Sequence, residues 1–188
     1  MKNFQRLAAT AILGFAGLLT NVGTQAATVT VDVSGAQSIN LQGEAGNTVW
    51  FVSIGANAWL TSLDWSVQLS AFAPSSLSEM QVSFGDSSGA IAINFAPGAA
   101  DMFNVRGNYS GSLNLTGAGI AAGSDGLLRI EFSEAYKDFD NGVAEGQWVS
   151  GSLGLGVTAA AVPEPASAAL LAIGLGLMGL QGRRARRG

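Results

Sequence analysis

Hydrophobic and polar residues alternate along most of the chain between Thr28 and Val157. The clearest case is LDWSVQLSA at 63–71, where every second residue is apolar and the residues between them are polar. A period of two is typical of a β-strand with one buried and one wet face. Further strands are predicted at TVTVDV (28–33), TVWFVSI (48–54), MQVSFG (80–85), AIAINF (90–95), YSGSLNL (109–115), LLRIEF (127–132) and QWVSGSLGLGV (147–157).

Clusters of Gly, Asn, Asp, Ser and Pro separate these segments, and no apolar stripe of helical period runs between them. The pattern predicts one all-β domain at residues 27–161, an antiparallel β-sandwich of jelly-roll type with eight or nine strands. Trp50 and Trp65 fall among core positions. Trp59 follows Asn57 and Ala58 and is the best candidate for an exposed, ligand-binding ring.

The first 26 residues have a different pattern. Lys2 and Arg6 precede an apolar stretch at 7–19, and Thr24-Gln25-Ala26 supplies small residues where a signal peptidase cuts. The pattern predicts an N-terminal signal helix at 1–26, with signal peptidase as its processing partner.

The C-terminal residues form a second apolar segment. Residues 166–180 are fifteen uncharged residues, and a helix of that length spans about 22 Å, less than the hydrocarbon core of about 30 Å. A topology signal of arginines follows, which should stay on the cytoplasmic side: Arg183, Arg184, Arg186 and Arg187. We expect a transmembrane helix that stops transfer but is short for a permanent anchor.

Pro163-Glu164-Pro165, the apolar segment and the arginine cluster together resemble the PEP-CTERM sorting signal. The resemblance covers residues 162–188. It implies recognition by exosortase, an integral-membrane transpeptidase-like enzyme of Gram-negative bacteria that make extracellular polysaccharide. It also implies removal of the tail and delivery of the protein to the cell surface or matrix.

The charge and composition of the middle segment exclude several functions. Residues 28–161 contain twelve acidic and three basic residues, a net charge of −9 that disfavours nucleic acid. The chain has no cysteine and no histidine, which excludes disulfides, thiolate chemistry and Ser-His-Asp catalysis. Glu131 and Glu134 are close in sequence, but Glu131 alternates with apolar residues and is expected to point to water. We therefore expect no enzyme.

The loop YKDFDNGVAEG at 136–146 is the candidate metal site. It holds four residues with oxygen ligands of the kind that calcium prefers: Asp138, Asp140, Asn141 and Glu145. Their spacing does not match an EF-hand, and a solvated turn between two strands is the other interpretation. No cofactor is expected otherwise.

Together these patterns predict an exported, non-catalytic protein of the cell surface or extracellular matrix. It would pass through a transient membrane-anchored stage, and its role would be structural or adhesive within extracellular polysaccharide. The alternative is a carbohydrate-binding module that uses Trp59 or a calcium-held loop.

Overall fold

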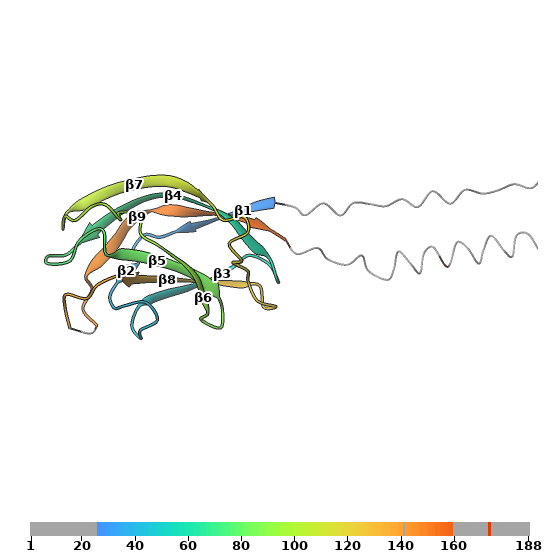
Figure 1. Cartoon of the computed structure of the whole chain (residues 1–188), viewed down its shortest axis with the longest axis horizontal. Helices are drawn as coiled ribbons and strands as arrows, with labels where there is room; N and C mark the ends of the chain where they lie inside the picture. The colour runs from blue at the N-terminus through green and yellow to red at the C-terminus, as the bar shows by residue number, and fades with distance from the viewer. Residues whose placement is uncertain (1–25, 141, 160–172, 174–188) are drawn as a thin grey trace, which may run out of the picture.

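The computed structural model describes residues 26–140, 142–159 and 173 (Figure 1). The predicted signal peptide lies outside these residues except for Ala26. The predicted transmembrane helix, the Pro-Glu-Pro motif and the arginine cluster lie outside them except for residue 173. Within the described part of the chain, no helix is long and apolar enough to cross a membrane.

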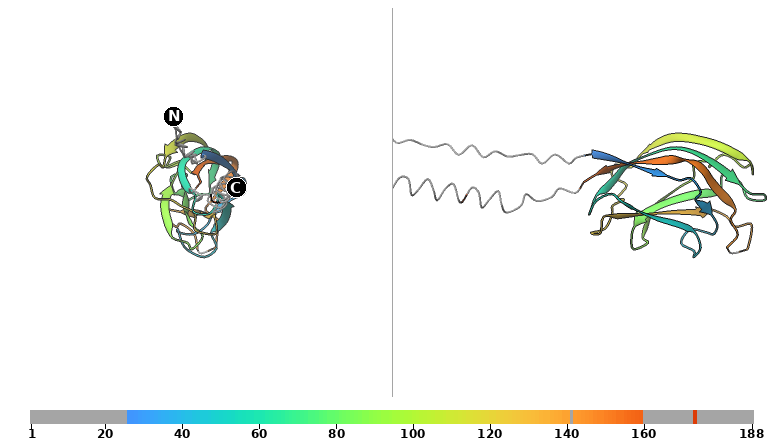
Figure 2. Two further views of the ribbon diagram at one scale, coloured as in Figure 1. Left: turned by 90° about the vertical axis from the view of Figure 1, so that its right-hand side faces the viewer. Right: turned by 180° about the vertical axis from the view of Figure 1, so that it is seen from behind.

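Nine strands in the described residues form two antiparallel sheets. Sheet A has the order β1-β9-β4-β7, with the short β2 also paired to β9, and sheet B has the order β3-β8-β5-β6. The sheets lie face to face (Figures 1 and 2), which confirms the predicted all-β sandwich. The strands are β1 (Ala26–Asp32), β2 (Gln37–Ser38), β3 (Thr48–Ser53), β4 (Trp59–Ala71), β5 (Met80–Asp86), β6 (Ile91–Phe95), β7 (Arg106–Asn114), β8 (Leu127–Glu134) and β9 (Gly146–Thr158).

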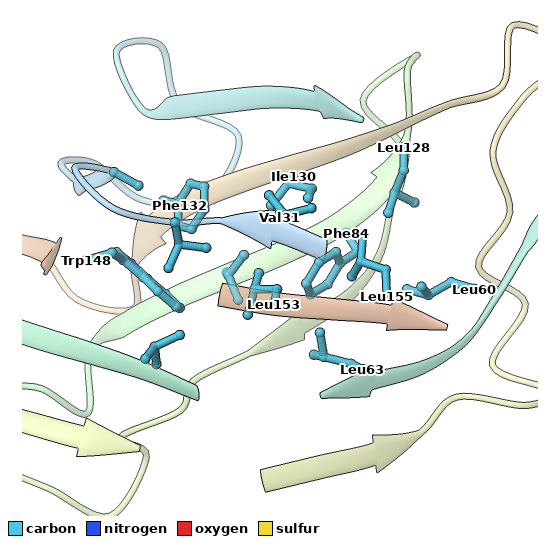
Figure 3. Packing of buried hydrophobic residues seen from close by; sticks show 14 of the residues in the cluster. Val31, Leu60, Leu63, Phe84, Leu128, Ile130, Phe132, Trp148, Leu153 and Leu155 are labelled. Atoms are coloured by element: carbon cyan, nitrogen blue, oxygen red, sulfur yellow. The ribbon is translucent and has the colours of Figure 1, made fainter. Parts of the chain in front are cut away.

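The core lies between the sheets and is made by the apolar half of each alternating pattern. Trp148, Phe84 and Phe132 are its largest fully buried side chains. Figure 3 shows side chains of this core, including Val31 and Leu63 of sheet A and Ile130 and Phe132 of sheet B. Burial of this apolar surface is the main driving force for the fold.

Aromatic pairs extend the core toward its margins. The Phe132 ring packs edge-on against Trp50 and Trp148, with centroid separations of 4.8 and 5.0 Å. Trp65 packs against Phe95 of the opposite sheet at 4.4 Å. Trp50 and Trp65 are partly buried against the core, as predicted.

The two ends of the sandwich differ in what they carry. Ala26 and Thr158 are register partners, so β1 begins where β9 ends (Figure 1). We call this the tail end. At the opposite end, the loop end, β4 stops at Ala71 beside Gly146 of β9. Four connections meet at the loop end: residues 39–47, 72–79, 96–105 and 135–145.

Candidate functional site

Trp59 is the first residue of β4, at the tail end. Its side chain is 50% exposed, as predicted for a candidate ligand contact. It borders a shallow pocket of about 300 Å³ lined by Trp59, Leu60, Thr61, Leu115, Thr116, Gly117, Gly119 and Thr158. None of these residues is ionisable at neutral pH. The pocket can therefore hold an apolar or sugar surface but has no group for acid–base chemistry.

The structure brings only part of the predicted calcium loop together. Glu145 is buried, and its carboxylate accepts hydrogen bonds from the Asp138 N–H at 3.0 and 3.1 Å and the Phe139 N–H at 2.9 Å. Asp140 is exposed, and Asn141 lies outside the described residues. Glu145 thus stabilises the 135–145 loop by accepting hydrogen bonds from its backbone N–H groups.

No three acidic side chains in the described ranges are grouped so as to hold a metal ion. The calcium site therefore stays a prediction.

Two further carboxyl groups, those of Glu79 and Glu134, lie near this loop and were not among its predicted ligands. Glu79 accepts hydrogen bonds from the Ser75 hydroxyl and the Ser76 N–H, each at 3.0 Å. Partial desolvation and the carboxylates of Glu79 and Glu145 raise the pKa of Asp138. The result is an acidic cluster of Glu79, Glu134, Asp138 and Glu145 at the loop end.

Glu134 is the most unusual member of the acidic cluster. It is buried, and neither carboxylate oxygen has a hydrogen-bond partner. Burial, followed by the charge of Glu145, raises the pKa of Glu134 to about 8. Ser38 lies close enough to oppose this shift slightly, although no hydrogen bond of normal geometry joins the two side chains. Glu134 is therefore mostly a neutral acid at pH 7.

Lys137 is the cation nearest in sequence to the acidic cluster, but it does not pair with it. Its Nζ donates to the Asn40 Oδ1, which also accepts the Gly142 N–H at 3.3 Å. The one ion pair among the described residues joins Arg129 and Glu131. Within the part of the chain that the structure describes, the acidic cluster thus has no ion-pair partner.

The prediction that Glu131 points to water is wrong. Alternation places Glu131 on the outer face of sheet B, but the 39–47 loop folds over that face and buries it. Its Oε1 accepts the Gly43 N–H at 2.8 Å and the Asn47 Nδ2 at 2.7 Å, and its Oε2 pairs with Arg129 at 2.6 Å. A carboxylate saturated in this way holds the loop and is not poised for catalysis.

Exposed apolar side chains gather at the loop end. Met102 and Phe103 are 73% and 71% exposed, and Phe72, Val105, Tyr136 and Val143 also face solvent. The loop end and the tail end therefore both have exposed apolar side chains, but the acidic cluster lies at the loop end.

Residues 161–187 match the family model of the PEP-CTERM protein-sorting motif. The chain carries this sorting motif. The motif supports export and sorting by an exosortase-type enzyme through a transient membrane-anchored step. The match leaves the sandwich domain without a family.

Comparison with solved structures finds distant likenesses. The infectious bursal disease virus VP2 subviral particle is 14% identical with a TM-score of 0.36, covering 72% of this chain and 33% of that one. The T13 particle of the same virus is 16% identical with a TM-score of 0.37, and the match covers 81% of this chain and 35% of that chain. The complex of the Aeromonas sobria serine protease with its ORF2 chaperone is 12% identical with a TM-score of 0.35, and the match covers 73% of this chain and 28% of that chain. The chain thus spans about a third of each. No curated protein sequence matches the chain.

Proposed function

We propose that this chain is a non-catalytic protein delivered to the cell surface or the extracellular matrix, with a structural or adhesive role within extracellular polysaccharide. The sorting motif at 161–187 carries this proposal. It directly follows β9, which ends at the tail end beside Ala26. A tail held at the membrane would therefore leave the loop end as the part of the sandwich farthest from it.

The surface of the loop end supports an adhesive role. Exposed aromatic rings such as Phe72 and Tyr136 can pack against the apolar faces of sugar rings. An exposed group of large apolar side chains is uncommon on a monomer that contacts nothing. Glu131 and Glu145 are engaged in loop contacts, which is consistent with a structural role for these two carboxylates.

The alternative is carbohydrate binding at the Trp59 pocket. Its support is the half-exposed indole beside an uncharged hollow. The two candidates lie at opposite ends of the sandwich, so separate substitutions distinguish them.

Extraction of the extracellular polysaccharide tests the proposal. Phe72→Ser/Tyr136→Ser should lower the fraction of protein that copurifies with polysaccharide at least fivefold, while Phe51→Ser, an equally exposed ring on the outer face of sheet B, should leave it unchanged. Equal loss in both variants would contradict adhesion by the loop end. Loss only in Trp59→Ala, with a matching loss on a glycan array, would favour the alternative.

A further inference from the structure

Strand β7 is an open edge of sheet A. Among the described residues its nine residues pair only with β4, in unbroken register from Ser62 opposite Asn114 to Ser70 opposite Arg106. The other edge strands of the main sheet orders are shorter: β1 has seven residues, β3 six and β6 five. β7 is the long arc along the top of Figure 1.

This edge has few of the features that normally keep edge strands apart. Natural edges are blunted by proline, by charged side chains, above all lysine, by bulges or by short length. β7 contains no proline or lysine, and its pairing with β4 has no bulge. By contrast, the pairing of β6 with β5 contains a register shift next to Gly85. The free edge of β7 is therefore a template for a further strand.

Both ends of β7 adjoin apolar surface. The exposed segment 102–105 comes just before it, and Leu115, which lines the Trp59 pocket, comes just after it. Ser110 is the central residue of the strand, and Val105 and Leu115 lie five residues before and after it. A two-fold axis at Ser110 therefore places the apolar segment of one copy beside the pocket rim of another.

We propose that a second copy of this chain pairs antiparallel along β7, with a two-fold axis at Ser110, so that the two A sheets become one continuous sheet. The axis sets Ser110 opposite Ser110, Val105 opposite Leu115 and Tyr109 opposite Gly111 of the second copy. Within the strand the axis also sets Leu113 opposite Gly107. The rings of Trp65 and Tyr109 cover Gly111 and Gly107, so the side chains of the second copy would pack against these rings.

Charge favours the same face. The domain carries a net charge of −9 over residues 28–161, so two copies repel over most of their surfaces. β7 has no acidic residue, and Arg106 is its one charged side chain. Pairing along β7 therefore brings the copies together where acidic side chains are absent from the contact strand.

The two-fold axis also determines the relative orientation of the two copies. A two-fold axis normal to a sheet reverses the strand direction, so the tail end of one copy lies beside the loop end of the other. Two copies held side by side by their tails in one membrane cannot meet in this way. Pairing would follow tail removal, or join copies on facing surfaces. This consequence rests on the proposed function, whereas the interface itself does not.

Single cysteines in the full-length chain test the interface, because the natural chain has none. Ser110→Cys places the new thiol on the axis, where directly opposed Cα atoms lie about 4.5–5.5 Å apart, within disulfide range. Ser112→Cys is the matched control: it is equally exposed and faces the same way, but it would lie opposite Asn108 of the second copy. Unchanged thermal melting of both variants would show that they fold.

After mild oxidation, disulfide-linked dimer is measured on non-reducing gels, separately for the detergent-extracted membrane fraction and the material outside the cells. We expect at least fivefold more linked dimer for Ser110→Cys than for Ser112→Cys, and loss of the Ser110→Cys dimer when Val105→Asp is added. Equal linking by both cysteines, or no linking in either fraction, would overturn the interface. Because detergent frees the copies from their shared membrane, linking found only in the detergent extract would still support the interface while contradicting release, so the two proposals fail separately.

Discussion

Two glutamates of β8 are equally buried but lie in opposite environments. Glu131 lies on the outer face of sheet B, under the 39–47 loop, and its carboxylate has three charged or N–H partners. Glu134 points into the sandwich at the loop end, and its carboxyl oxygens have none. Burial alone therefore does not determine the charge of a carboxyl group. The donors around it do.

The contrast assigns the two groups different roles. The Glu131 side chain is paired and hydrogen-bonded, because a partly buried guanidinium and two N–H donors replace the water it has lost. Glu134 has the charge of Glu145 nearby and no compensating donor, so it keeps its proton. The following changes test this contrast, from the largest expected effect to the smallest.

The pH dependence of stability should be dominated by Glu134. Its pKa rises from 4.5 in the unfolded chain to about 8 in the folded chain, so the folded state binds the proton more tightly. Stability is then full below pH 4.5 and decreases as pH rises toward 8, by about 3–5 kcal/mol. Glu134→Gln resembles the protonated side chain and should abolish this decrease in urea unfolding between pH 5 and 9. The same decrease in both proteins would assign it to another group.

Removal of Glu131 should destabilise the fold at pH 7. Glu131→Ala leaves Arg129 without its carboxylate and the N–H groups of the 39–47 loop without an acceptor, at a cost of about 3 kcal/mol. Thermal unfolding at pH 7 measures the loss, and Glu131→Gln, which keeps one acceptor oxygen, should lose less. If Glu131→Ala and Glu134→Ala had the same effect at pH 7, the contrast would be wrong.

Asn40 connects the two regions. Its side chain donates to the Ala45 carbonyl at 2.7 Å and accepts from Lys137 and the Gly142 N–H, while its backbone carbonyl accepts the Glu134 N–H at 2.9 Å. Asn40→Ala should cost about 2 kcal/mol, because Asn40 is buried and all the hydrogen bonds of its side chain are lost. Hydrogen exchange should show faster opening in both the 39–47 and 135–145 loops. Faster exchange in only one of them would show that the regions are independent.

The smallest effect is expected for Asp140. It is exposed and outside the acidic cluster, so Asp140→Asn should change stability by less than about 0.5 kcal/mol, with or without calcium. Thermal melting with calcium and with chelator measures this. A calcium-dependent rise in Tm that disappears in Asp140→Asn would instead restore the predicted loop site.

Much of the fold could be predicted from local pattern. Period-two alternation identified strand β4 and the inward side of Trp65, and the position of Trp59 after Asn57 and Ala58 predicted its exposure. The sorting motif could also be predicted, because it depends on a short contiguous sequence.

The acidic cluster could not be predicted because it is assembled from distant segments. Alternation placed Glu131 on the outer face, but no local signal says that the 39–47 loop covers it. A signal for Glu134 did exist: it continues the inward series of Leu128, Ile130 and Phe132 on β8. Its nearness to Glu79 and Glu145 appears only once β5 pairs with β8 in sheet B and sheet A, which contains β9, packs against them.

Intact mass is the most direct test of the central claim, that the tail sorts this sandwich out of the membrane. It should be measured separately on protein from membranes and from the medium or loose matrix. The account predicts a species outside the membrane that begins near Ala27 and ends near Val162–Pro165. A chain with its full C-terminus, confined to the membrane, would contradict it and make the tail a plain anchor.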